Sequence, residues 1–189
     1  MFRRAGKMTD MIKIGSKLAL ICAIAALCLG AVNMVTEPKI EEFRIAKLNA
    51  ALEKVSPGGI IGEVAEAEDD VVISYYPVDK DGEVSGYILN LKGSGYAGNL
   101  IILASYSPDG EVIGSVLMDH EETPGLGKEA ENDWYMKKYL GFAGKNIPSV
   151  KRQLSQEDSD AISGATITFN GVAKALIAGS NYVITKGGK

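Results

Sequence analysis

The chain has 189 residues, of which 46% are hydrophobic and 23% are charged, and its formal net charge is −4. This length allows one domain of ordinary size with an additional element and excludes two large domains. The composition is typical of a globular protein, and the acidic balance argues against nucleic acid as a partner.

The first informative segment is 18–36, which contains no charged side chain. As a helix it would be about 28 Å long at about 1.5 Å per residue, close to the hydrocarbon thickness of a bilayer, about 30 Å. We therefore predict a transmembrane helix over 18–36. Basic side chains outnumber acidic ones in 1–17, which indicates a cytoplasmic N-terminus and places the rest of the chain on the other face of the membrane. The charged residues of 1–17 are Arg3, Arg4, Lys7, Lys13 and Lys17 against Asp10.

A cleaved signal peptide has the same basic and apolar pattern. We favour a retained single-pass anchor in the cell inner (cytoplasmic) membrane, because the closest cleavage candidate, Leu29-Gly30-Ala31, has leucine where a small residue is needed. Cys22 and Cys28 both lie in the apolar segment, and neither follows a small residue as a lipoprotein cysteine would. The remainder of the chain has no cysteine, which excludes iron–sulfur clusters and disulfides there.

A stalk and linker are predicted over 37–59. Glu37-Pro38 suggests a break at the membrane surface, and the apolar spacing after it predicts an amphipathic helix that ends before Ser56-Pro57-Gly58-Gly59. The soluble domain, 60–189, would then lie outside the cytoplasm.

The next part of the chain predicts strands over 71–76, 84–91, 100–106 and 112–118. Turn sequences at 79–82 and 107–110 predict that the first pair and the last pair are antiparallel hairpins. A glycine-rich connection, 93–98, joins the two middle strands and is weak evidence for a phosphate loop.

Helices are predicted after the strands. The first runs over about 128–140 and is closed by Gly141, and Ser155 would cap a short turn. A last amphipathic helix begins near Thr168 or Asn170. The fold class is therefore α+β, a mainly antiparallel sheet flanked by helices, without the strand–helix alternation of a doubly wound nucleotide fold.

A run of small and hydroxyl residues, 160–168, lies just ahead of the last predicted helix. Gly164 and Ala165 let the backbone approach a bulky ligand, and the Thr166 hydroxyl is left exposed beside a helix N-terminus that favours a phosphate. The alternative is a hydroxyl-rich helix cap without a ligand.

A second loop, 120–127, follows the fourth predicted strand. Its proline and two glycines would fix a turn whose backbone can lie against a flat ring, with Leu126 as an apolar contact and Glu122 and Thr123 as polar ones. The alternative is a rigid strand-to-helix connection. We assign no chemistry to His120, because a lone histidine usually braces a loop, and we expect Trp134, Tyr135 and Tyr139 to pack in the core.

Together these loops resemble the covalent FMN-binding domain family. Asp160-Ala161-Ile162-Ser163-Gly164-Ala165-Thr166 matches its D-x-x-[S/T]-G-A-T motif, and His120 to Gly127 matches its H-x-E-T-P-G-L-G loop. The resemblance covers about 71–184 and implies FMN held on Thr166 through a phosphoester. It implies cofactor contacts from Asp160, Ser163, Gly164, Ala165, Thr168, Glu122, Thr123, Pro124, Gly125, Leu126 and Gly127. We add Lys128, which adjoins the second loop and could offset the charge of the phosphate.

One membrane helix, a stalk and one such domain resemble the G subunits of Rnf complexes. The resemblance implies an electron-transfer subunit of an ion-translocating ferredoxin:NAD oxidoreductase, with other Rnf subunits and the bilayer as partners and a flavin transferase that uses FAD and Mg²⁺ for maturation. The alternatives are a free-standing anchored FMN carrier, the related C subunit of sodium-translocating NADH:quinone reductase, and an anchored binding domain without a ligand.

Overall fold

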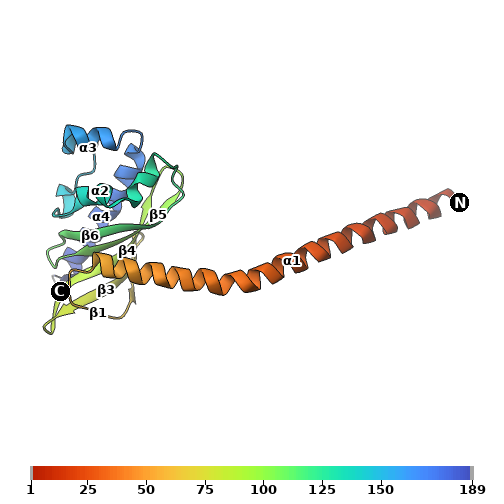
Figure 1. Cartoon of the computed structure of the whole chain (residues 1–189), viewed down its shortest axis with the longest axis horizontal. Coiled ribbons are helices and arrows are strands. Elements are labelled where there is room, and N and C mark those ends of the chain that lie inside the picture. The colour runs from red at the N-terminus through yellow and green to blue at the C-terminus, as the bar shows by residue number, and fades with distance from the viewer. Residues whose placement is uncertain (1, 188–189) are drawn as a thin grey trace. The chain divides into compact units, whose positions relative to one another are not determined.

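The structure is a computed structural model that describes residues 2–187, with side chains described for 11–186. The chain forms two compact units, Met1–Ala46 and Lys47–Lys189 (Figure 1).

One helix, α1 (Phe2–Val55), supplies the first unit and ends within the second. By its length and composition it could cross a membrane. The predicted break at Glu37-Pro38 is wrong, because the helix continues through Pro38. A proline removes one helical hydrogen bond, and the following segment is rich in Ala, Leu, Lys and Glu, whose high helix propensity sustains the helix. The predicted end before Ser56 is confirmed.

The second unit contains one antiparallel sheet in the order β1-β3-β4-β5-β6, with β2 also paired to β3. The predicted α+β class and the four predicted strands are confirmed. The two additional strands were missed because two residues are too few to show a periodic pattern. The strands are β1 (Ile60–Ile61), β2 (Ala65–Glu66), β3 (Val72–Lys80), β4 (Glu83–Ser94), β5 (Asn99–Tyr106) and β6 (Val112–Asp119).

Both predicted hairpins form. Asp81 and Gly82 have φ of 56° and 87° between the paired residues Lys80 and Glu83. Two positive φ angles in a two-residue loop give the turn that matches the twist of the flanking strands. Gly110, with φ of 81°, closes the β5–β6 connection.

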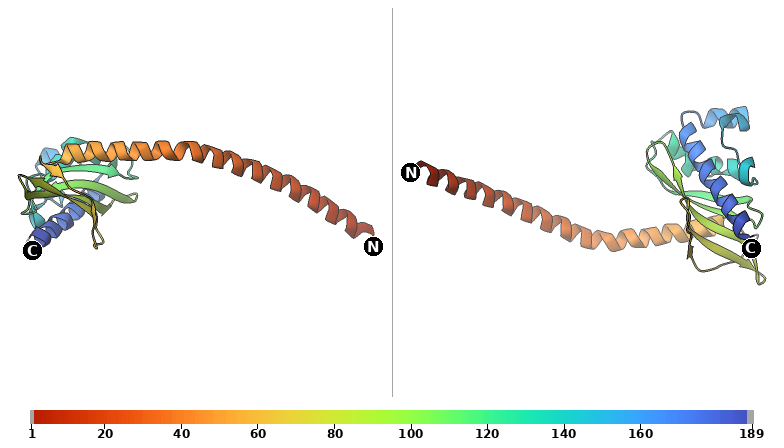
Figure 2. Two further views of the ribbon diagram at one scale, coloured as in Figure 1. Left: turned by 90° about the horizontal axis from the view of Figure 1, so that it is seen from below. Right: turned by 180° about the vertical axis from the view of Figure 1, so that it is seen from behind.

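Each face of the sheet is covered by a helix. The long C-terminal helix α4 (Thr166–Gly187) packs on one face, and Figure 2 shows it lying across β4 and β5. The hydroxyls of Tyr106 and Tyr139 donate to the carbonyls of Leu176 and Phe169 of α4, both at 3.1 Å. Burial raises the pKa of both phenols well above 10.0.

The opposite face is covered by the end of α1. Ala51 and Val55 are 6% and 2% exposed and pack against Val78, Ile88 and Leu103 of the sheet. Residues 47–55, the end of the predicted stalk helix, therefore contribute to the core of the second unit.

The single helix predicted over 128–140 is wrong. Three short pieces replace it: η1 (Gly127–Glu131), α2 (Asp133–Met136) and η2 (Lys137–Tyr139). Between η1 and α2 the backbone of Asn132 is extended, with φ of −80° and ψ of 141°. This break turns Tyr135 and Tyr139 inward, where Tyr139 stacks on Phe169 at 5.1 Å between ring centroids. Tertiary packing of the aromatic rings here overrides helix propensity.

Both tyrosines are fully buried, as predicted, whereas Trp134 is 40% exposed. Two 3₁₀ turns follow, η3 (Gly144–Asn146) and η4 (Lys151–Gln153), and lead to α3 (Gln156–Ala161). Ser155 caps α3 by accepting from the Asp158 N–H at 3.1 Å, which confirms the predicted cap.

Helix α4 approaches β4 so closely that Gly171 has no room for a side chain. A Cβ at this position would lie 1.9 Å from the Ser94 carbonyl oxygen. We expect Gly171→Ala to destabilise the domain by about 1–3 kcal/mol, the usual range for overpacking. Thermal unfolding of the detergent-solubilised chain measures this. Thr185→Ala, an exposed change on the same helix, is the control, and equal melting temperatures for the two variants would contradict the packing argument.

Candidate functional site

Thr166 is the first residue of α4, so the helix begins earlier than predicted. Gly164, with φ of 87°, turns the chain into it. The first helical hydrogen bond runs from the Phe169 N–H to the Ala165 carbonyl at 2.9 Å. Within the described residues, the N–H groups of Thr166, Ile167 and Thr168 have no acceptor. The Thr166 hydroxyl therefore lies beside unpaired N–H donors at the positive end of a long helix.

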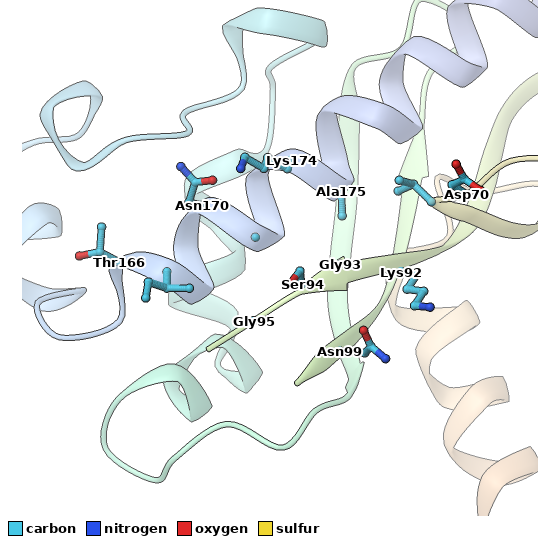
Figure 3. A pocket seen from close by; sticks show the side chains of 13 residues that line it. Asp70, Lys92, Gly93, Ser94, Gly95, Asn99, Thr166, Asn170, Lys174 and Ala175 are labelled. Atoms are coloured by element: carbon cyan, nitrogen blue, oxygen red, sulfur yellow. The ribbon is translucent and has the colours of Figure 1, made fainter. Parts of the chain in front are cut away.

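Two cavities meet at Thr166 and Ile167. The loop cavity, about 420 Å³, is lined by Tyr96, Glu122, Thr123, Leu126, Gly127, Gly164, Thr166, Ile167 and Thr168. The lysine cavity, about 580 Å³, lies along the other side of α4 and is lined by Asp70, Val71, Lys92, Gly93, Ser94, Gly95, Asn99, Thr166, Ile167, Asn170, Gly171, Lys174 and Ala175 (Figure 3).

The two cavities differ in chemistry. Three large side chains of the loop cavity are exposed although they are largely apolar: Tyr96 at 73%, Ile167 at 55% and Leu126 at 43%. Such a convergence of exposed apolar surface is typical of a site for a flat, apolar ligand. The lysine cavity is instead lined by three charged residues, Lys92 of β4, Lys174 of α4 and Asp70. An anionic group on Thr166 would lie beside the unpaired N–H groups of the first turn of α4 and next to the apolar surface of the loop cavity.

The wall of the loop cavity is organised by the buried side chain of Glu122, which is 6% exposed. Its Oε1 accepts the N–H groups of Tyr96 at 2.7 Å and Ala97 at 3.1 Å. Its Oε2 accepts the Thr168 hydroxyl at 2.6 Å. One carboxylate thus joins the β4–β5 turn, the 120–127 loop and the first turn of α4.

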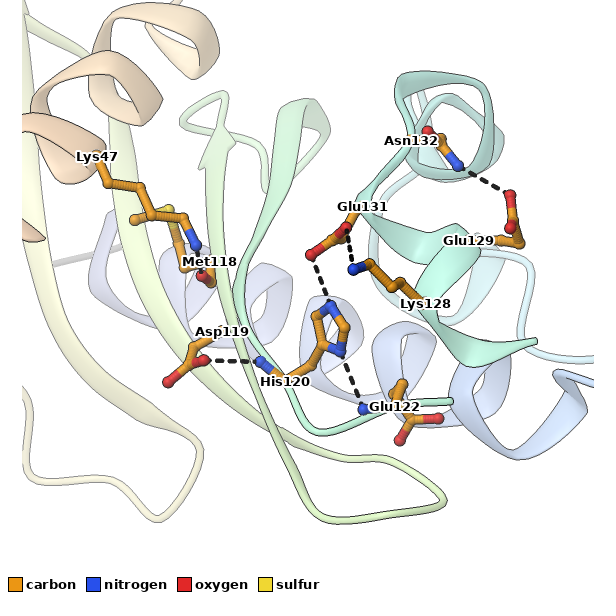
Figure 4. Close-up of polar contacts among 9 residues, drawn as sticks. All are labelled: Lys47, Met118, Asp119, His120, Glu122, Lys128, Glu129, Glu131 and Asn132. Atoms are coloured by element: carbon orange, nitrogen blue, oxygen red, sulfur yellow. Dashed lines mark hydrogen bonds and ion pairs between the residues drawn. The ribbon is translucent and has the colours of Figure 1, made fainter. Parts of the chain in front are cut away.

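His120 braces the same loop, as expected of a lone histidine (Figure 4). Its Nδ1 accepts the Glu122 N–H at 3.0 Å, which leaves the proton on Nε2, 2.8 Å from Glu131. The hydrogen bond from His120, followed by the charge of Lys128, lowers the pKa of Glu131. In the same view, the Lys47 ammonium donates to the Met118 carbonyl at the end of β6.

The two sequence motifs meet through Leu126 and Gly164. A Cβ on Gly164 would lie 2.7 Å from Leu126 Cδ2, so only glycine permits this contact. The segment carrying Thr166 is held from the other side by α3, where the Lys138 ammonium, 7% exposed, pairs with Asp158. Lys138 also lies 4.8 Å from the Trp134 ring centroid.

Of the residues predicted to contact a cofactor, seven line the loop cavity: Glu122, Thr123, Leu126, Gly127, Gly164, Thr166 and Thr168. The other six line neither cavity: Asp160, Ser163, Ala165, Pro124, Gly125 and Lys128. Asp160 is exposed and accepts from Gln156 at 3.0 Å, whereas Lys128 lies 3.9 Å from Glu131. Tyr96 and Ile167 were missed, although the tyrosine within the 93–98 glycine run was an available signal.

Comparison with known proteins agrees with this geometry. The FMN-binding domain family matches residues 95–179, which include both loops and the first 14 of the 22 residues of α4. The G subunit of the Na(+)-translocating ferredoxin:NAD(+) oxidoreductase complex of Acetobacterium woodii is 32% identical over 91% of this chain and 89% of its own. The G subunit of the proton-translocating ferredoxin:NAD(+) oxidoreductase complex of Clostridium ljungdahlii is 27% identical over 93% of this chain and 94% of its own.

The chain belongs to the family of these G subunits. A solved structure, NqrC of Shewanella oneidensis, is 21% identical, with a TM-score of 0.48 over 66% of this chain and 69% of that one. The family match extends through α1 as well as the domain, because the G subunits align along nearly their whole length.

The ion pair that holds α3 makes the site sensitive to acid. Hydrogen bonds from Lys138 and Ser155 lower the pKa of Asp158 below its ordinary value of 3.8. A depressed folded-state pKa stabilises the fold above the unfolded-state pKa, and this contribution is lost as the pH falls through the folded-state pKa. We therefore expect Asp158→Asn to lower the melting temperature at pH 7 and to have less effect below pH 3.8.

Melting curves of the wild type and of Asp158→Asn, recorded from pH 7 to below pH 3.8, check the expectation. Glu157→Gln, on the same exposed turn, is the control. An Asp158→Asn penalty that is independent of pH would show that the charge is not what holds α3.

Proposed function

We propose that this chain is an electron-transfer subunit carrying one FMN, attached covalently to Thr166, in a membrane-bound, ion-translocating ferredoxin:NAD oxidoreductase complex. The observation that carries the proposal is the place of Thr166: an exposed residue at the start of α4, beside unpaired N–H groups and lining both the apolar loop cavity and the lysine cavity. Membership of the G-subunit family supports the complex and the electron-transfer role.

The residues present fit FMN. The unpaired N–H groups of the first turn of α4 favour a phosphate group esterified to the Thr166 hydroxyl, and Lys174 supplies positive charge in the adjoining cavity. The exposed faces of Tyr96, Leu126 and Ile167 suit an apolar ring system. When bound, FMN supplies the redox chemistry, and the protein supplies position, solvent exclusion and electrostatic tuning.

Attachment requires an activated FMN donor. Transfer from FAD would form a bond between the Thr166 oxygen and the FMN phosphorus, break the diphosphate bond and release AMP, with the hydroxyl proton lost to solvent. A separate flavin transferase with Mg²⁺ would perform this step. A covalent bond prevents loss of FMN by dissociation outside the cytoplasm.

The membrane arrangement forms part of the proposal. The apolar part of α1 would span the bilayer once, with the basic N-terminus in the cytoplasm and the FMN domain on the other side. Electrons would then pass through a carrier fixed to the outer face, next to the other subunits of the complex.

The decisive measurement is the intact mass of the natively produced full chain. We expect one FMN added with loss of one water, and complete loss of this addition and of in-gel flavin fluorescence in Thr166→Ala. Thr185→Ala, at the far end of α4, should keep both signals. A native preparation whose Thr166 is unmodified would contradict the proposal and favour an anchored domain without a ligand.

Purification from membranes separates the remaining alternatives. A member of an Rnf complex should bring several polytopic partners and a ferredoxin:NAD oxidoreductase activity in mild detergent. The chain alone, with its flavin, would instead indicate a free-standing carrier, and NADH:quinone reductase activity would indicate the related complex. Thr166→Ala should assemble with the same partners but lack electron transfer, because it removes the cofactor and leaves the fold.

A further inference from the structure

Glu122 stands out because it is a buried carboxylate beside the proposed flavin cavity and both of its oxygens are already bonded to the protein. Oε1 accepts two backbone N–H groups and Oε2 accepts one hydroxyl, at 2.6 to 3.1 Å. These three donors take three of the roughly four acceptor sites of a carboxylate, so little capacity is left for a ligand. Glu122 therefore serves the site through its position and its charge.

The surrounding chain is shaped to admit this carboxylate. A Cβ on Gly95 would lie 2.1 Å from Oε1, and a Cβ on Gly127 would lie 2.0 Å from Oε2. Two glycines on different segments thus leave the space that the carboxylate fills. Thr168, its hydroxyl donor, is 1% exposed and lies in the first turn of α4, two positions after Thr166. The position of the first turn of α4, which carries Thr166, relative to Tyr96 therefore depends on Glu122.

We propose that Glu122 is a positioning residue that also lowers the reduction potential of the flavin. This inference rests on the proposed function. Reduction adds negative charge to the ring, and a carboxylate in the wall of the same cavity opposes that charge. The carboxylate is buried, so its field is less screened by solvent than that of a surface acid. Within the described residues, no ammonium or guanidinium group is paired with Glu122 to cancel it.

The near-isosteric variant Glu122→Gln separates charge from shape. The amide oxygen can accept the Tyr96 and Ala97 N–H groups, and the amide nitrogen can donate to the Thr168 hydroxyl, which accepts as readily as it donates. The variant thus removes the charge and keeps three hydrogen bonds. Glu121→Gln removes a charge at the neighbouring exposed position and is the matched control.

The first measurement is the midpoint potential of the flavin in the natively flavinylated, detergent-solubilised chain. We expect Glu122→Gln to raise the ratio of reduced to oxidised flavin at a fixed potential by about tenfold, which is about 30 mV for a two-electron couple. Glu121→Gln should shift it much less. A Glu122→Gln potential equal to or below that of the wild type, or equal shifts in the two variants, would overturn the tuning role.

The second measurement tests positioning in chain made without the transferase, so it does not depend on the flavin. Hydrogen exchange of the Tyr96 and Ala97 amides should be near wild type in Glu122→Gln and about tenfold faster in Glu122→Leu. Unchanged exchange in a folded Glu122→Leu chain would overturn the positioning role. If Glu122→Leu does not fold, the comparison is made with Thr168→Val, which removes the hydroxyl that donates to Glu122. Slower exchange of the two amides in Glu122→Gln than in Thr168→Val supports the positioning role. Equally fast exchange in these two variants would contradict it.

The two failures can be told apart. Absence of FMN from the native chain defeats the proposed function in the mass measurement, before any potential is recorded. A chain that carries FMN but shows no shift defeats only the tuning role of Glu122.

Discussion

The site depends on one buried carboxylate. Glu122 is held where three segments converge, and it bonds to the turn between β4 and β5 and to the first turn of α4. A buried carboxylate is costly unless its oxygens are fully hydrogen-bonded. The three donors meet that requirement only if the segments keep their relative positions. The cost of leaving Glu122 unsatisfied is therefore what fixes the loops around Thr166.

Close approach between neighbouring segments, at Glu122 and elsewhere, explains several of the glycines. Gly95 and Gly127 leave room for the carboxylate, Gly164 for Leu126, and Gly171 for the Ser94 carbonyl. The glycine-rich run of the β4–β5 turn and the two-glycine loop are thus places of close approach. Gly95 and Gly127 serve a steric purpose, whereas Gly164 also has a positive φ of 87° and Gly125 has a positive φ of 76° with no atom within 4 Å of its Cβ position.

Much of the fold could be predicted from local pattern, and the exceptions have physical causes. The strands from 72 to 119 alternate or run apolar over enough residues to be recognised, and their turns carry Asp-Gly signals. The continuous helix over 128–140 was wrong because burying Tyr135 and Tyr139 against Phe169 requires the extended Asn132, a demand that comes from a segment distant in sequence. At the site, spacing identified Thr166 and the 120–127 loop. It could not show that Glu122 faces the protein, because its three donors lie 25, 26 and 46 residues away.

The placement of Thr166 on a long, buried helix has a consequence for electron transfer. Helix α4 is fixed along its length by tyrosine hydroxyls at the carbonyls of Phe169 and Leu176 and by backbone contact at Gly171. A group esterified at its first residue is therefore attached to a helix that is anchored to the rest of the domain, with only the bonds of the threonine side chain between them. A flexible loop would let the ring move over several ångströms and vary its distance to a partner. Attachment at the start of α4 restricts that movement, and the Glu122 bond to Thr168 extends the restriction to the first turn itself, where the helix would otherwise fray.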